Sequence, residues 1–208
     1  LCAARNDYGW MSEESADNAE RLGKRRLIIV DPIDGTLAFI KRKPEFTICA
    51  AVVEDGAPVS AVIFNPMTGE MFEAVSGGGA RLNGASIRVS ARGELADCRM
   101  MVARDVIEHP AWPVPWPKME LGKRSSIAYR MALVAAGVYD AMMALSSKHE
   151  WDTAAGTLIV EEAGGVVSGH TGAKLAYNQA VPTHRSIVCA GPALHAAIAE
   201  IADRVGAE

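Results

Sequence analysis

Asp31 and Asp34 lie three residues apart and form the most informative acidic cluster of the sequence. The apolar run before them is typical of a buried strand, which would bring Asp31 to the edge of a sheet. Pro32 fixes a turn there, so Asp34 can return to the same side. The two carboxylates and the carbonyl oxygen of Ile33 could then converge on one cation. Such oxygen ligands suit hard divalent cations, and magnesium usually binds a few carboxylates together with substrate phosphate and water.

Gly35 and Thr36 follow this pair and are expected to open a helix. Backbone N–H groups at the positive end of a helix suit a phosphate, so the two residues predict a phosphate site beside the cation. A simpler interpretation stays open, because Asp-Pro and Asp-Gly are common turn dipeptides and an aspartate before a helix often caps it.

Two further acidic clusters are candidates for the same chemistry. Glu13 and Glu14 stand close to Trp10, and Asp152 follows Trp151. Adjacent glutamates often lie only on a solvated surface. Asp152 could likewise be an ordinary N-cap of the helix that follows it. The spacing of these residues alone leaves both alternatives open.

Four apolar runs rich in β-branched residues predict an antiparallel sheet in the first half of the chain, with strands over residues 27–30, 46–53, 58–64 and 70–75. The first of these strands is expected to stop at Asp31. Asp55-Gly56, between the second and third runs, is the strongest short signal for a hairpin. The glycine-rich segment 76–84 has no periodicity, so we expect a tight loop there.

The second half is predicted to alternate strands and helices, which indicates an α/β arrangement. Strands are expected over 98–103 and 138–145, and helices over 125–137, 152–163 and 193–205. Three prolines and two tryptophans predict a loop over 111–117. We place the boundary so that residues 1–96 form a metal-binding half with an antiparallel sheet and residues 97–208 form an α/β half with the Trp-Asp motif.

The composition excludes several functional classes. The 208 residues include 21 Lys and Arg against 25 Asp and Glu, a formal net charge of −4, and no basic face for a nucleic-acid polymer is evident. No apolar run approaches the length that spans a bilayer membrane. The four scattered cysteines indicate neither a disulfide framework nor a zinc site, which fits a reducing cytoplasm. Residues 1–5 read like the last turn of a helix, and we expect an N-terminal piece to be missing.

Together, the three acidic clusters resemble the signatures of the inositol monophosphatase superfamily. The matching motifs are Trp-Met-Ser-Glu-Glu-Ser at 10–15, Asp-Pro-Ile-Asp-Gly-Thr at 31–36, and Trp-Asp-Thr-Ala-Ala-Gly at 151–156 with Glu-Ala-Gly-Gly at 162–165. The family comprises magnesium-dependent, typically lithium-sensitive phosphomonoesterases, among them inositol monophosphatases and 3'(2'),5'-bisphosphate nucleotidases. The resemblance implies an α/β fold of the layered αβαβα sugar-phosphatase type, with its two N-terminal helices missing here.

The resemblance implies two or three magnesium ions, held by Glu13, Asp31, the carbonyl of Ile33, Asp34 and Asp152. Asp31 would bridge two of the ions. The Ile33 carbonyl would complete the first site, and Asp34 with Asp152 would hold the second. In the family, the N-terminal helices supply a further acidic residue for a third ion, and this sequence shows no counterpart of those helices.

The same resemblance assigns catalytic roles to Glu13, Thr36 and Asp31. Glu13 and Thr36 would orient the attacking water, and the N–H groups of Gly35 and Thr36 would hold the phosphate. Glu14 would be a supporting carboxylate behind the metal ligands. Two metal ions can activate water on one side of phosphorus and neutralise the leaving oxygen on the other, so no covalent intermediate is required.

The expected substrate is a small phosphorylated metabolite. Inositol phosphatases of the family carry a glutamate seven residues before the aspartate of the Trp-Asp motif, where it accepts hydrogen bonds from inositol hydroxyls, and this position is Leu145 here. Lys41 lies in a segment that resembles bacterial bisphosphate nucleotidases, although a solvated helix end explains it equally well. Arg130 stands where those enzymes have a basic residue. We therefore favour 3'-phosphoadenosine 5'-phosphate, with inositol 1-phosphate as the alternative.

A different class of function is a non-catalytic regulatory or interaction member of the family. It predicts the loss of at least one metal ligand, whereas Glu13, Asp31, Asp34, Asp152 and Thr36 are all present. A related alternative is a scaffold that binds magnesium but has lost its activity with the N-terminal helices. Family members are often dimers, so a homodimer is a further expectation.

Overall fold

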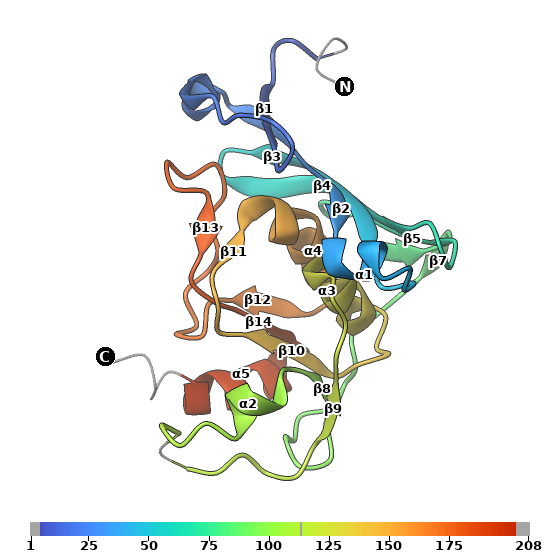
Figure 1. Cartoon of the computed structure of the whole chain (residues 1–208), viewed down its shortest axis with the longest axis vertical. Coiled ribbons are helices and arrows are strands. Elements are labelled where there is room, and N and C mark those ends of the chain that lie inside the picture. The colour runs from blue at the N-terminus through green and yellow to red at the C-terminus, as the bar shows by residue number, and fades with distance from the viewer. Residues whose placement is uncertain (1–4, 113, 203–208) are drawn as a thin grey trace.

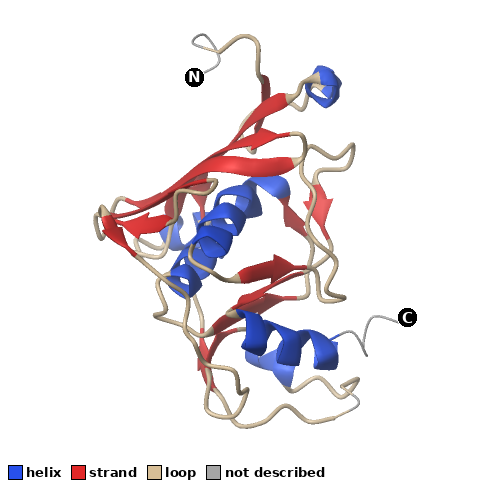
Figure 2. Ribbon diagram, turned by 180° about the vertical axis from the view of Figure 1, so that it is seen from behind, coloured by secondary structure: helices blue, strands red, loops and turns tan. Residues whose placement is uncertain are grey.

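The computed structural model describes residues 5–112 and 114–202. Two sheets lie one above the other, with helices between them and a second layer of helices under the lower sheet (Figure 1, Figure 2). The helix end predicted at residues 1–5 and the last part of the helix predicted over 193–205 fall almost wholly outside the described residues. Within the described part, no helix combines the length and the apolar character that crossing a membrane requires.

The first sheet has seven strands in chain order, antiparallel except for the parallel pair β1 and β2. Its strands are β1 (Gly9–Ser12), β2 (Arg26–Asp34), β3 (Thr47–Glu54), β4 (Ala57–Asn65), β5 (Glu70–Val75), β6 (Ala80–Leu82) and β7 (Ala85–Ser86). Asp55 and Gly56 connect β3 and β4 with φ angles of 50° and 81°, as a tight hairpin turn requires. The predicted antiparallel sheet and its hairpin are confirmed.

Two details of this prediction are wrong. β2 does not stop at Asp31 but continues to Asp34, because a shift in register between them lets the strand pass Pro32, which has no N–H to donate, and pair again. The segment 76–84 is not only a loop, since it contains β6 and a turn at Asn83 that leads into β7. The polar, left-handed turn residue was the signal for this second hairpin.

The second half contains a mixed five-stranded sheet in the order β12-β14-β10-β8-β9 and a separate pair, β11 with β13. These strands are β8 (Arg99–Met101), β9 (Glu120–Gly122), β10 (Ala141–Ala144), β11 (Lys148–His149), β12 (Val166–Ser168), β13 (Thr183–His184) and β14 (Ile187–Ala190). The described residues of the predicted loop 111–117 form no helix or strand. The predicted alternation of strands and helices is confirmed.

The helices comprise α1 (Thr36–Ile40), α2 (Arg104–Ile107), α3 (Ile127–Ala135), α4 (Glu150–Glu162), α5 (Pro192–Ala202) and the 3-10 helix η2 (Ala19–Gly23). α3 and α4 pack in one core with the inner face of the first sheet, and α5 packs in a second core under the other sheet (Figure 2). Small residues allow close packing in the first core: a Cβ on Gly156 would lie 2.7 Å from Met131 Sδ. This packing positions the start of α4 next to β2.

No described helix covers the other face of the first sheet (Figure 1), and apolar side chains on this face are exposed. Ile48, Met71 and Val75 are 42%, 40% and 59% exposed, and a hollow of about 590 Å³ lies over β2 to β6. Exposed apolar faces of this kind are typical of interaction surfaces. The expected homodimer and the division of the chain at residue 96 both stay predictions.

Candidate metal centre

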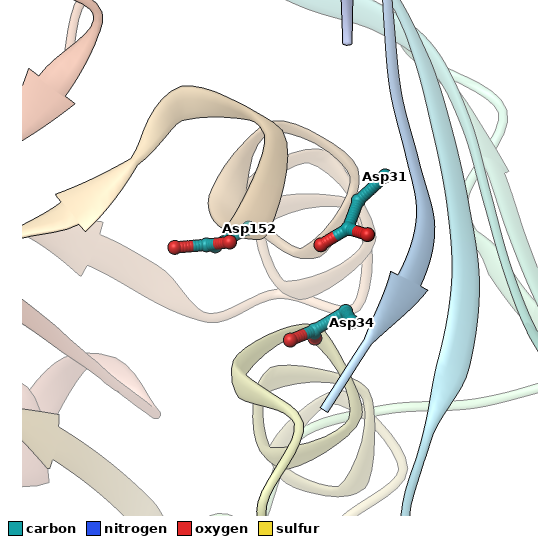
Figure 3. A group of neighbouring side chains, drawn as sticks. All are labelled: Asp31, Asp34 and Asp152. Atoms are coloured by element: carbon teal, nitrogen blue, oxygen red, sulfur yellow. The ribbon is translucent and has the colours of Figure 1, made fainter. Parts of the chain in front are cut away.

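Asp31, Asp34 and Asp152 form a cluster of carboxylates between the first sheet and the central helices. Figure 3 shows the two β2 residues, Asp31 and Asp34, with their side chains directed toward Asp152 at the start of α4. One carboxylate oxygen from each residue lies within 4.8 Å of the others. Asp31 is 1% exposed and Asp34 is 6% exposed. The structure therefore brings together three of the residues that the sequence analysis assigned to metal binding.

The turn after Asp31 orients both its carboxylate and the next carbonyl. The N–H of Ile33 donates to Asp31 Oδ1 at 2.9 Å, and the hydroxyl of Thr36 donates to the Ile33 carbonyl at 3.2 Å. Carboxylate and carbonyl oxygens keep further lone pairs after accepting one hydrogen bond. Both groups are thus held in place and still have acceptor capacity for a cation.

Asp34 is held at the N-terminus of α3. Its carboxylate accepts hydrogen bonds from the Ser126 hydroxyl at 2.5 Å, from the N–H of Ala128 at 2.7 Å and from the N–H of Ile127 at 3.3 Å. The positive end of a helix stabilises such a negative charge. Sequence reasoning missed Ser126, although a serine directly before an apolar helical run is a known N-cap signal.

Asp152 has two roles. It is the third residue of α4, and it accepts a hydrogen bond from the N–H of His149 at 2.9 Å as part of a capping box. His149 is the N-cap of α4, so the alternative interpretation of Asp152 as the N-cap is wrong, although the Asp152 carboxylate does cap the helix from its third position. Because a carboxylate has two oxygens with several lone pairs, capping does not exclude membership of the acidic cluster.

No cationic side chain of the described residues contacts the carboxylates of this cluster. Burial, with repulsion from Asp34 and Glu13, raises the pKa of Asp31 to about 8. Burial also raises the pKa of Asp34 to about 7, against the hydrogen bond from Ser126. Burial raises the pKa of Asp152 as well. Among the described residues none of the three aspartates forms an ion pair, so this all-oxygen donor set fits a divalent cation such as magnesium.

Glu13 and Glu14 lie in the exposed turn after β1. The charge of Glu13 contributes to the raised pKa values of Asp31 and Asp152, but Glu13 is not within the group of three. The N–H of Glu14 donates to Ser12 Oγ at 3.4 Å, and its carboxylate has no hydrogen bond or ion pair with a described residue. The structure thus places Glu13 near the cluster and Glu14 outside it.

Gly35 occupies a position that only glycine suits. Its φ is 93°, and a Cβ there would lie 2.9 Å from the carbonyl oxygen of Glu45 and 3.0 Å from the backbone nitrogen of Ser126. A side chain would therefore displace Ser126, which holds Asp34. The first N–H groups of a helix have no partner within it, so Gly35 and Thr36 can present theirs to an anion beside the carboxylates.

A family model described as "Inositol monophosphatase family" matches residues 2–207. The chain belongs to this family. Over 173 residues it is 36% identical to the inositol-1-monophosphatase of Rhizobium meliloti (strain 1021), an alignment that covers 79% of this chain and 64% of that protein. It is 34% identical to the Nus factor SuhB of Xylella fastidiosa (strain Temecula1 / ATCC 700964) over 182 residues, 83% of this chain and 64% of that one. The chain thus spans less than two thirds of either relative.

Solved structures of the inositol monophosphatase family share this fold. The crystal structure of the extragenic suppressor protein suhB from Bartonella henselae has a TM-score of 0.83 and 30% sequence identity, covering 97% of this chain and 82% of that one. The predicted α/β fold class, an antiparallel sheet followed by an α/β half, is confirmed. The names of these relatives are those of an inositol monophosphatase and SuhB, and they do not support the bisphosphate nucleotidase branch that the sequence analysis favoured.

The three substrate contacts expected in this family member have different surroundings. Lys41 is exposed at the end of α1, as the alternative of a solvated helix end predicts. Arg130 is half-buried on α3, where burial lowers its pKa and the nearby charge of Asp34 opposes that shift. Leu145 is partly buried and packs against the hydrophobic core under the second sheet. Among these three residues, Arg130 is the one whose pKa is affected by a carboxylate of the cluster, Asp34.

Sequence reasoning missed Lys148, which stands on β11 four residues before Asp152. Burial lowers its pKa, while the charge of Asp152 raises it and that of Arg130 lowers it further. The ammonium group donates to the hydroxyl of Ser146 at 2.6 Å and to its carbonyl at 3.1 Å. A basic residue in the segment leading to the Trp-Asp motif was the signal for this additional cation.

Proposed function

We propose that this protein is a magnesium-dependent phosphomonoesterase that acts on a small phosphorylated metabolite. The convergence of Asp31, Asp34 and Asp152 within 4.8 Å, next to the start of α1, carries this proposal. Such a site places cation ligands beside free backbone N–H groups, which is the combination that binding and hydrolysing a phosphate ester needs. Membership of the inositol monophosphatase family supports the same activity.

Glu13, Asp31, the Ile33 carbonyl, Asp34 and Asp152 would hold two magnesium ions. Bound there, magnesium would supply a more acidic water and would neutralise charge on the phosphate and its leaving oxygen. Asp31 is the ligand proposed to serve both ions, because it lies in the cluster with Asp34 and Asp152 and the charge of Glu13 contributes to its raised pKa.

The remaining residues would bind and orient the reactants. The Thr36 hydroxyl donates its hydrogen bond to the Ile33 carbonyl, so its oxygen lone pairs are left to accept a hydrogen bond from the attacking water. The Glu13 carboxylate would accept a second hydrogen bond from the same water. The N–H groups of Gly35 and Thr36 would hold phosphate oxygens. With the water fixed in this way, phosphate is released without a covalent intermediate.

We place inositol 1-phosphate first among the substrates and 3'-phosphoadenosine 5'-phosphate second. The name of the Rhizobium meliloti relative supports the inositol phosphate, which was the alternative in the sequence analysis. Arg130 and Lys148 keep the nucleotide as a candidate, because two cations near the cluster would suit a substrate with a second phosphate.

Phosphate release from the full chain tests the proposal. We expect release that depends on added magnesium when inositol 1-phosphate and 3'-phosphoadenosine 5'-phosphate are compared at equal concentration. A preference for the nucleotide would keep the metal chemistry and reverse the order of substrates.

The relatives named Nus factor SuhB favour a second candidate, a regulatory or interaction member of the family. That function predicts no phosphate release from either compound.

Leu145→Glu is expected to raise the ratio of inositol phosphate to nucleotide turnover about threefold to tenfold. The new carboxylate could accept hydrogen bonds from inositol hydroxyls, each of which contributes about 1 kcal/mol. The measurement is kcat/KM for both substrates. Leu145→Met is the matched control, since it keeps the apolar packing against the lower core and should leave the ratio unchanged. An unchanged ratio in the glutamate variant would remove Leu145 as a determinant of substrate choice.

A further inference from the structure

A partly buried polar network joins the segment before β2 to the start of α4. Arg21, in the 3-10 helix η2, lies at its centre, and its side chain is only 1% exposed. Glu150, the first residue of α4, lies at the other end and is fully buried. The network therefore connects the parts of the chain that lead to Asp31 and to Asp152.

The guanidinium of Arg21 is almost completely satisfied. Two of its nitrogens donate to the carboxylate of Asp17 at 2.6 and 2.9 Å. A third contact reaches Asn178 Oδ1 at 2.8 Å, and a fourth reaches the carbonyl of Gln179 at 3.0 Å. Asn178 returns a hydrogen bond from its side-chain amide to the carbonyl of Arg21 at 3.1 Å. Such a planar fork of donors is specific to arginine, because lysine offers a single point charge.

Asn178 and Gln179, which contact Arg21, also hold Glu150. The N–H of Asn178 donates to its carboxylate at 2.7 Å, and the N–H of Gln179 donates at 2.9 Å. Asn178 makes these contacts in a left-handed conformation, with φ at 62°. Glu150 is two residues before Asp152 in the first turn of α4, so the position of its carboxylate also affects where Asp152 lies.

The other side of the network rests on the first sheet. A Cβ on Gly9 would lie 3.2 Å from the Cβ of Arg21, so η2 packs directly on β1. β1 in turn pairs with β2 through Gly9 and Leu27. The N–H of Tyr177 donates to the carbonyl of Gly56 at 3.0 Å, which ties the loop before Asn178 to the hairpin of β3 and β4. The network thus spans from the sheet that carries Asp31 to the helix that carries Asp152.

We infer that Arg21 is a positioning residue for the metal centre. It holds Glu150 through Asn178 and Gln179, and Glu150 in turn fixes the position of Asp152 relative to Asp31. The inference rests on the proposed function only in taking magnesium as the bound ion. Removal of a group that hydrogen-bonds to a metal ligand and orients it typically lowers metal affinity about 10- to 100-fold. Arg21 acts on Asp152 indirectly, through a loop and Glu150, so we expect a loss of affinity at the lower end of that range.

Magnesium binding to Arg21→Met, measured by isothermal titration calorimetry, is expected to be about tenfold weaker than in the unmodified chain. Arg21→Lys should recover only part of the loss, because it keeps the charge but not the fork. Arg104→Met is the matched control, since the Arg104 side chain is 73% exposed and its ion pair among the described residues is with Glu108. It should bind magnesium as the unmodified chain does.

Asn178→Gly is the milder second variant, and it decides the question if Arg21→Met does not fold. Glycine suits the left-handed backbone and keeps the N–H group that donates a hydrogen bond to Glu150. Both hydrogen bonds between the Asn178 side chain and Arg21 are lost. We expect magnesium affinity to fall about threefold to tenfold. Folded variants of Arg21 and Asn178 that bind magnesium within twofold of the unmodified chain would overturn the inference, even if they unfold in less urea. Weakened binding in a chain that releases no phosphate from either substrate would support the inference and remove the proposed function.

Discussion

Asp31→Asn should lower magnesium-dependent phosphate release at least a hundredfold, which corresponds to about 2.7 kcal/mol of lost transition-state stabilisation. Asparagine has nearly the same shape and can still accept the hydrogen bond that the N–H of Ile33 donates to Asp31 Oδ1. The variant therefore removes the charge proposed to serve both magnesium ions while it preserves the turn. The measurement is kcat and kcat/KM at saturating magnesium.

Asp105→Asn is the matched control for this experiment. Asp105 is an exposed carboxylate in the first turn of α2, outside the acidic cluster. It should keep the turnover of the unmodified chain. Turnover of Asp31→Asn near that of the unmodified chain would contradict the proposed metal site. The urea midpoint of the metal-free Asp31→Asn variant should not fall, because the substitution removes a like charge from beside Asp34.

The metal-free protein should lose stability as the pH rises from 6.5 to 8. Asp31 and Asp34 have pKa values of about 8 and about 7 in the folded chain, because they are buried with other carboxylates. In the unfolded chain an aspartate has a pKa of about 3.9, so the folded state binds more protons throughout this range. Stability then falls with pH, by at most about 1.4 kcal/mol per pH unit for each group.

The chosen pH range separates this effect from that of the buried histidines. Burial lowers the pKa of His184 to about 4 and also lowers that of His195. Histidines of this kind make stability rise with pH, but mainly below their unfolded pKa of about 6.5. Urea unfolding at pH 6.5, 7.2 and 8.0 in the presence of a chelator measures the slope. Asp31→Asn should flatten it, and a slope that is equal in both proteins would contradict the assignment.

Magnesium should reverse the loss of stability at pH 8. A ligand at a hundred times its Kd stabilises a folded protein by about 2.7 kcal/mol. The gain should be smaller at pH 6.5, because magnesium must then displace protons from Asp31 and Asp34. Equal stabilisation at both pH values would contradict the binding of the ion to these two carboxylates.

Much of the fold could be predicted because its signals are local. The hairpin at Asp55-Gly56 needs two adjacent residues in left-handed conformations, and the sequence shows a dipeptide that adopts them readily. The strand 70–75 and the helices α3 and α4 follow from apolar runs bounded by turn or capping residues. Where the signal was short, as in β6 and β7, the prediction of a loop was wrong. Strands of only two or three residues are stabilised by the strands they pair with and not by their own composition.

The sequence by itself determined which residues could bind a cation, and the tertiary structure decided which of them meet. Asp31, Pro32 and Ile33 form their turn locally, so its chemistry could be predicted from spacing. Asp34 reaches Ser126 across 92 positions of sequence, and Arg21 reaches Asn178 across 157. Contacts over such separations arise only when the sheets and helices pack, because residue type and spacing describe neighbours in the chain and not neighbours in the core.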